Sequence, residues 1–99
     1  MPFETTTATT QHLKVRPTSR GVRVWLEGDR LTAAGFTKGS TYTREVSNGV
    51  IVMMLDSDGE KRVSGKAKPI IDISAKQLDG FATGQDITAT FEAGIITIK

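Results

Sequence analysis

The chain has 99 residues, no cysteine, and a formal net charge of +2 at pH 7. This length suits one domain with a single core, and the lack of cysteine excludes disulfide frameworks and thiolate metal sites. No apolar run approaches membrane-spanning length, and the first residues lack a signal-peptide layout, so we expect a cytoplasmic protein with no membrane partner.

In chain order, residues 1–11 are polar and rich in threonine, which predicts a flexible arm. Apolar and polar residues alternate over 22–26, as in a half-buried strand, and residues 30–34 are expected to form a short helical turn. Two further strands are predicted on either side of Asn48-Gly49, a pair that favours a tight hairpin. Residues 56–68 are polar and charged, and we expect them to form a surface linker.

Segments 33–54 and 78–99 repeat one pattern at an offset of 45 positions. Six of the 22 aligned positions are identical, and in the first segment these are Gly35, Phe36, Gly39, Thr43, Gly49 and Ile51. The second copy predicts a strand at 69–73, a turn at 75–79 and a C-terminal hairpin. Because one such unit cannot bury its apolar face alone, we predict that the two copies exchange hairpins about a pseudo-twofold axis.

Several short motifs accompany this repeat. A basic segment, HLKVRP at 12–17, precedes VWLEG at 24–28, AAGF at 33–36 and GVIV at 49–52. In these motifs the first copy resembles the SpoVT/AbrB-like swapped-hairpin family, and within it the SymE-like branch. Residues 69–99 are similar to the more general pattern of that family.

The resemblance implies a mostly-β fold, a small barrel built from two tandem swapped-hairpin repeats, each with a short helical turn. We expect one barrel domain over 12–99, with repeat one at 12–55, a linker at 56–68 and repeat two at 69–99. Duplication favours a monomer that is its own internal pseudo-dimer, with a homodimer as the alternative. Members of the family are DNA-binding regulators and antitoxins, and the SymE-like branch includes toxins that act on RNA or the nucleoid.

Positive charge is concentrated in the first half of the chain. Residues 1–50 hold seven Lys or Arg against four acids, whereas residues 51–99 hold six against seven. The candidate phosphate-binding residues are Arg16, Arg20, Arg23, Arg30, Lys38, Arg44, Lys61 and Arg62. The alternative is that they are solvated charges that protect strand edges from pairing, and for the Lys61–Lys68 cluster a solubilising loop is the favoured interpretation.

Other polar residues do not form a catalytic pattern. With one histidine, His12, and no Ser–His–Asp spacing, we expect no catalytic residue, no metal site and no cofactor. A ribonuclease would need an acid–base pair that the sequence does not supply. Trp25 could stack on a base or anchor a protein partner, but packing on the outside of the barrel is favoured, since Ile70 occupies the equivalent position.

Two functions from different classes follow. The first is a nucleic-acid-binding regulator or toxin-like protein that contacts DNA or RNA phosphates through its basic first half. The second is a small inhibitor, encoded by a phage or mobile element, that binds a host defence protein. The small size and the lack of a catalytic pattern agree with both.

Overall fold

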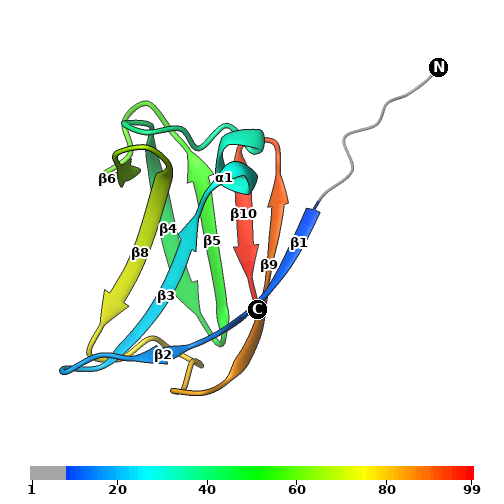
Figure 1. The fold of residues 1–99 in the computed structure, drawn as a ribbon. Coiled ribbons are helices and arrows are strands. Elements are labelled where there is room, and N and C mark those ends of the chain that lie inside the picture. Colours follow the sequence, from blue (N-terminus) through cyan, green and yellow to red (C-terminus); the bar gives the residue numbers. More distant parts are fainter. Residues whose placement is uncertain (1–8) are drawn as a thin grey trace.

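A computed structural model describes residues 9–99, which form a mostly-β structure (Figure 1). In this range one short helix, α1 (Asp29–Ala33), follows the third strand. The strands are β1 (Thr9–Lys14), β2 (Arg16–Pro17), β3 (Val22–Glu27), β4 (Thr41–Ser47), β5 (Val50–Leu55), β6 (Lys61–Arg62), β7 (Ser64–Gly65), β8 (Pro69–Ala75), β9 (Asp86–Glu92) and β10 (Ile95–Ile98). The mostly-β class that the sequence predicted is therefore confirmed.

The strands form two antiparallel sheets. The larger has the order β1-β9-β10-β5-β4-β6, and the smaller has the order β2-β3-β8-β7. Hydrogen bonding within residues 9–99 leaves these as two separate sheets, and no ladder closes them into one ring. The chain crosses between the sheets at Val15, between β1 and β2, and at Val63, between β6 and β7; both valines are buried.

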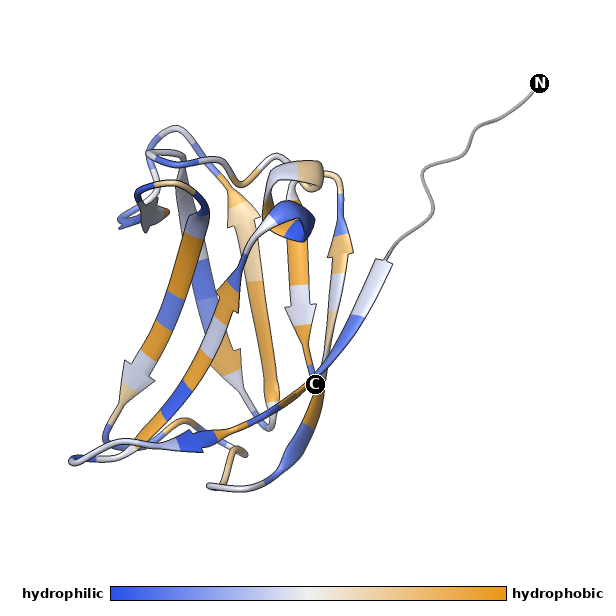
Figure 2. Cartoon of the chain, in the orientation of Figure 1, coloured by the Kyte–Doolittle hydropathy of each residue, from blue (hydrophilic) through white to orange (hydrophobic). Residues whose placement is uncertain are grey.

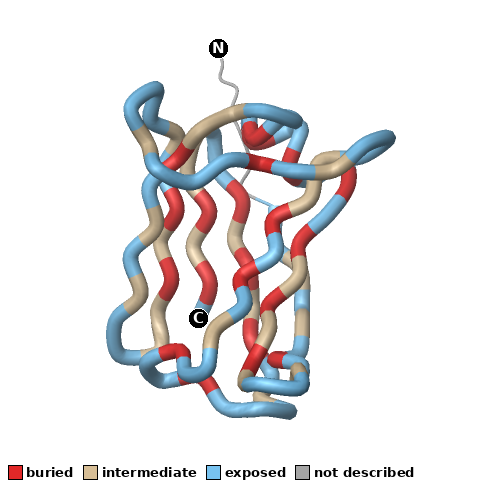
Figure 3. Tube along the Cα trace, turned by 90° about the vertical axis from the view of Figure 1, so that its left-hand side faces the viewer, coloured by how far each residue is buried: buried red, intermediate tan, exposed pale blue. Residues whose placement is uncertain are grey.

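The core lies between the two sheets. Apolar and polar residues alternate along the strands (Figure 2), and buried residues alternate with exposed ones in the same way (Figure 3). In β3 the buried residues are Val22, Val24 and Leu26, which is the period expected of a strand with one face on a core. The largest fully buried side chains include Phe36, Leu26, Leu31, Ile51, Met53, Ile71, Ile73, Ile96 and Ile98.

The pairing of β3 with β8 follows the offset of the sequence repeat. Trp25 lies opposite Asp72, and Glu27 lies opposite Ile70. Ile70 lies 45 positions after Trp25, and Glu27 lies 45 positions before Asp72. The offset of the sequence repeat therefore maps one pair onto the other. This register is the one expected between two strands related by a local twofold axis.

The larger sheet contains a second pairing with the same property. Strands β5 and β10 place Ile51 opposite Ile98 and Met53 opposite Ile96, and the 45-residue shift again exchanges the two pairs. Two hydrogen bonds at the hairpin tips are also related by the 45-residue offset. The Gly49 amide donates to the Asp79 carbonyl at 2.9 Å, and the Gly94 amide donates to the Ala34 carbonyl at 2.8 Å.

The prediction of a short helical turn in the second repeat is wrong. Residues 75–79 contain no helix; Ala75 ends β8, and a turn links Leu78 to Phe81. The cause lies at the end of the preceding strand. Gly28, with φ of 97°, ends β3 before α1, whereas Ile73 at the matching position continues β8 as a fully buried residue. Residues 76–79 are then all that remain before Gly80, whereas residues 28–34 lie between β3 and Gly35, so the second segment is too short for a helix like α1 with its flanking residues.

Two predicted boundaries also change. Of the arm expected at 1–11, residues 1–8 lie outside the described residues, and 9–11 belong to β1, where Thr9 pairs with Phe91. The linker expected at 56–68 contains β6 and β7, which pair with β4 and β8. Only part of that segment is therefore loop, and the buried Val63 fixes it to the core.

Tyr42, the single tyrosine of the chain, allows a test of this core by titration. It is 4% exposed and meets the ring of Phe36 edge-on at 5.8 Å between centroids. Burial raises the pKa of the Tyr42 hydroxyl above 10.0, and the charge of Arg44 partly opposes this.

We expect the tyrosinate absorbance of the folded protein to develop above pH 10. Because the folded state holds this proton more tightly, the contribution to the free energy of unfolding is complete below pH 10 and is lost as the pH rises through the folded pKa. Tyr42→Phe should remove this part of the alkaline destabilisation. Native absorbance that titrates at or below pH 10 would contradict the burial of the hydroxyl.

Candidate nucleic-acid interface

The eight predicted basic residues do not form one surface. Arg16, Arg20 and Arg23 belong to the β2–β3 hairpin, at one end of the molecule (Figure 1). Arg30 on α1 and Lys61 and Arg62 on β6 lie at the opposite end (Figure 1). Lys38 belongs to that second end, because the amide of the next residue, Gly39, donates to the carbonyl of Val63 beside β6. Arg44 is half-buried in the middle of β4.

The β2–β3 hairpin holds three arginines close together. Arg16 and Arg23 are direct partners in the β2–β3 ladder, so their side chains leave the same face of the small sheet. Arg20 is exposed in the connecting turn, which is closed by a 2.9 Å hydrogen bond from the Thr18 amide to the Gly21 carbonyl. A Cβ at Gly21 would lie 2.1 Å from the Ala75 carbonyl oxygen, so glycine lets this turn pack against the end of β8.

Arg23 is held by its neighbours on the outer face. Its Nε lies 3.1 Å from Oδ1 of Asp72, and its guanidinium lies 5.6 Å from the centre of the Trp25 ring. The ion pair adds little stability because the Arg23 side chain keeps 41% of its surface exposed. Its effect is orientation, since the pair and the ring together fix the guanidinium beside Trp25.

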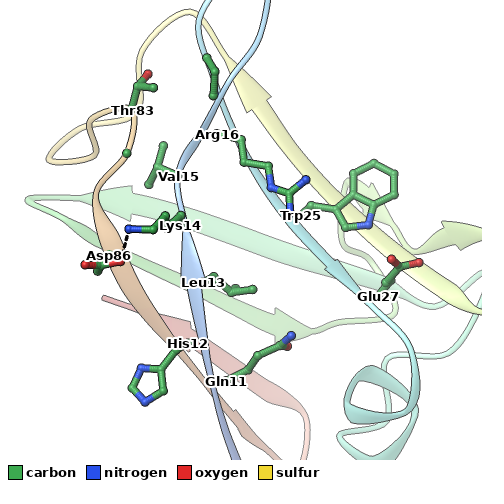
Figure 4. Close-up of a pocket in the computed structure, with 12 residues that line it drawn as sticks. Gln11, His12, Leu13, Lys14, Val15, Arg16, Trp25, Glu27, Thr83 and Asp86 are labelled. Atoms are coloured by element: carbon green, nitrogen blue, oxygen red, sulfur yellow. Dashed lines mark hydrogen bonds and ion pairs between the residues drawn. The ribbon is translucent and has the colours of Figure 1, made fainter.

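A groove opens next to Trp25, between β1 and β3 (Figure 4). β1 pairs with β9 in the larger sheet, the chain then crosses at Val15 into the smaller sheet, and there β2 pairs with Val22 and Arg23 alone. Within residues 9–99, Trp25 and Glu27 therefore have no neighbouring strand on that side. The space left by this divergence is about 700 Å³, with a smaller adjoining cavity of about 410 Å³ that Arg16, Arg23 and Trp25 share.

Lys14 lies on the wall of this groove, and the sequence did not single it out. Its Nζ lies 2.8 Å from Oδ1 of Asp86, a residue 72 positions away that faces it across the β1–β9 ladder. The hydrogen bond from Lys14, followed by its charge, lowers the pKa of the Asp86 carboxyl. Because Lys14 is paired with Asp86 and Arg23 with Asp72, Arg16 is the arginine or lysine of the groove that has no ion pair within residues 9–99.

Figure 4 shows the Arg16 side chain extending toward Trp25, with Glu27 beyond the indole. Arg23, Trp25 and Glu27 are alternate residues of one strand and so follow one another along the outer face, about 7 Å apart. The groove thus offers a cation at one end, an aromatic surface in the middle and a carboxylate at the other end.

The basic residues at the opposite end are exposed and make no cation–π contact within residues 9–99. Arg30, Lys38, Lys61 and Arg62 form no ion pair within residues 9–99. Residues 9–99 contain no group of three or more His, Asp or Glu side chains that could hold a metal ion. The one helix in this range, α1, is too short to cross a bilayer.

Comparisons with protein-family models, with curated proteins and with solved structures gave no significant match to this chain.

Proposed function

We propose that this chain is a nucleic-acid-binding protein of the AbrB/SymE type, which contacts phosphates through the β2–β3 hairpin. The observation that carries the proposal is the grouping of Arg16, Arg20 and Arg23 on that one hairpin. Arginine suits this role, because its planar guanidinium binds phosphate oxygens through two parallel hydrogen bonds. A turn that projects three such groups can follow a phosphate backbone without reading base sequence.

The proposal includes a fold made of two swapped-hairpin repeats that together approach a small barrel. Its support is the pair of registers, β3 with β8 and β5 with β10, that the 45-residue offset exchanges. Further support comes from the two crossings between sheets. The amides of Val15 and Val63 donate to the carbonyls of Gln85 and Ser40, which are themselves 45 residues apart.

The charge distribution predicts how binding depends on salt. With a net charge of only +2, affinity must come from a few local contacts and not from a general positive field. Three phosphate contacts should give a slope of log affinity against log salt between about −2 and −3, because each contact releases about one counterion.

A pair of triple variants tests the proposal. Arg16, Arg20 and Arg23 are replaced by alanine in one, and Lys38, Lys61 and Arg62 in the other, so that both lose three charges. We expect the first to lose most of its affinity for DNA and RNA and to reduce the salt slope by about 2 to 3. The second variant should keep both the affinity and the salt slope of the unchanged chain. Fluorescence anisotropy at several salt concentrations measures these values, and equal binding by all three proteins would refute the hairpin as the contact surface.

A second function, an inhibitor of a host protein, is supported by the outer edge of β1. This six-residue strand stands at the end of the larger sheet with β9 as its one partner among residues 9–99. An unpaired edge of this length can accept a strand from a partner protein. A partner protein that binds the chain stoichiometrically after nuclease treatment, and that binds the triple arginine variant equally well, would favour this function.

A further inference from the structure

We infer that the groove beside Trp25 binds a base of single-stranded DNA or RNA, stacked on the indole. This inference rests on the proposed function and adds the class of nucleic acid to it. Phosphate contacts at the hairpin alone would serve a duplex equally well, whereas a stacked base must be free of its partner strand.

The first support is the position of Trp25. Along β3, its neighbours Val24 and Leu26 are buried in the core, while Trp25 points to the outer face and remains partly exposed. The adjacent strand stops short of it, because β2 pairs only with Val22 and Arg23. The indole therefore borders both cavities, and no other strand of residues 9–99 covers it.

The second support is the cation–π contact that the ring makes with Arg23. The Arg23 guanidinium lies 5.6 Å from the ring centre and is tied to Asp72 at 3.1 Å. An aromatic ring that is already oriented loses less entropy when a base stacks on it. Base–aromatic stacking of this kind is independent of base identity, since every base has a flat face.

The third support is the polarity of the groove. Arg16 lies at one end without an ion pair in residues 9–99, and Glu27 lies at the other end. A phosphate is favoured beside Arg16 and disfavoured beside Glu27, so a nucleotide should lie with its phosphate toward β2 and its base over Trp25. The carboxylate of Glu27 can then accept a hydrogen bond from an N–H group of the base, such as N3–H of thymine or uracil.

The other half of the chain lacks these features. At the position of Trp25 it carries Ile70, which lies opposite Ser64 on β7. Neither residue offers an aromatic face or a positive charge. We therefore expect one stacking site per chain.

Trp25 is the single tryptophan, so its fluorescence reports on this position alone. The probes are oligothymidylate and oligouridylate of ten nucleotides, an abasic phosphodiester strand of the same length and charge, and a ten-base-pair duplex. We expect both base-containing single strands to quench the emission and to bind about fivefold or more tightly than the abasic strand or the duplex.

Two variants locate the effect. Trp25→Leu should bind the thymidylate and abasic strands equally well, with its salt dependence unchanged, and Trp25→Phe should recover part of the difference. Ile70→Leu, at the matching position on β8, should bind like the unchanged chain. Circular dichroism confirms that each variant is folded, and the comparison of probes with the unchanged chain needs no variant at all.

The outcomes separate this inference from the proposed function. Equal, salt-sensitive binding of all probes with unchanged Trp25 emission would overturn the stacking site and leave phosphate binding by the hairpin intact. Tighter binding of the duplex would do the same. Failure of every probe to bind at low salt would overturn both.

Discussion

A chain that ends at Glu92 is expected to be unfolded at 25 °C. The deletion removes β10, which lies between β9 and β5 inside the larger sheet, so it divides that sheet and leaves β9 and β5 each with an unpaired edge. It also removes Ile96 and Ile98, both fully buried, whose burial contributes about 3 to 6 kcal/mol together. A domain of this size is stable by only about 5 to 15 kcal/mol, and the lost ladder hydrogen bonds add to the deficit.

Circular dichroism and thermal melting measure this effect. Deletion of Lys99 alone is the control, since this exposed residue contributes one hydrogen bond, from its amide to the Thr88 carbonyl at 3.0 Å. That control should change the free energy of unfolding by about 1 kcal/mol or less. A cooperative melt with the same midpoint after deletion of residues 93–99 would show that β10 is not part of the core.

Gly80→Ala is expected to destabilise the fold by about 3 kcal/mol or more. Gly80 has φ of 83°, and a Cβ there would lie 2.1 Å from the Gly49 nitrogen and 2.4 Å from its Cα. Both are backbone atoms at the tip of the β4–β5 hairpin, so no side chain can rotate to make room. The hairpin would have to move away, which would break the hydrogen bond from the Gly49 amide to the Asp79 carbonyl.

Two other glycines separate the steric clash from the cost of the backbone conformation. Gly84 has φ of 84° and no atom of residues 9–99 within 4 Å of the Cβ position, so Gly84→Ala should cost only about 1 to 2 kcal/mol. Gly35, 45 positions before Gly80, would meet only the end of the Leu55 side chain at 3.1 Å, and its substitution should cost slightly more than that of Gly84. Urea denaturation measures all three values. Equal losses would mean that the contact between Gly80 and Gly49 is not tight.

The sequence predicted those parts of the fold that depend on turns and on alternation. Asn48-Gly49 connects β4 and β5 as a hairpin, with positive φ at both residues. The tandem repeat, inferred from identities such as Gly35 and Gly80, remains a proposal, supported by two strand registers that the 45-residue offset exchanges. These features are local or periodic, so one sequence is enough to reveal them.

The parts that could not be predicted depend on contacts between distant segments. Val63 stands alone among charged and small residues, and nothing local distinguishes it from a loop residue. It is buried because β6 and β7 pair with β4 and β8 on either side of it. One signal was present: Arg62-Val63 resembles Lys14-Val15, but at a spacing of 48 residues, so a fixed offset of 45 misses it.

The candidate site shows the same division. Composition selected basic residues, and three of them do lie together, because Arg16, Arg20 and Arg23 are also close in sequence. The other five were placed elsewhere by the turns of the chain. The groove beside Trp25 was not predictable, since it exists only because the chain diverges at Val15 into a different sheet.

The place of β10 also affects how the protein is made. The strand that completes the middle of the larger sheet is the last of the ten to leave the ribosome, and its partner β5 is synthesised more than 40 residues earlier. Until then the inward apolar residues of β5, Ile51 and Met53, lack their cover. The sheet therefore cannot be completed until β10 has been made, and during that interval the exposed apolar residues of the half-built sheet favour association with other chains.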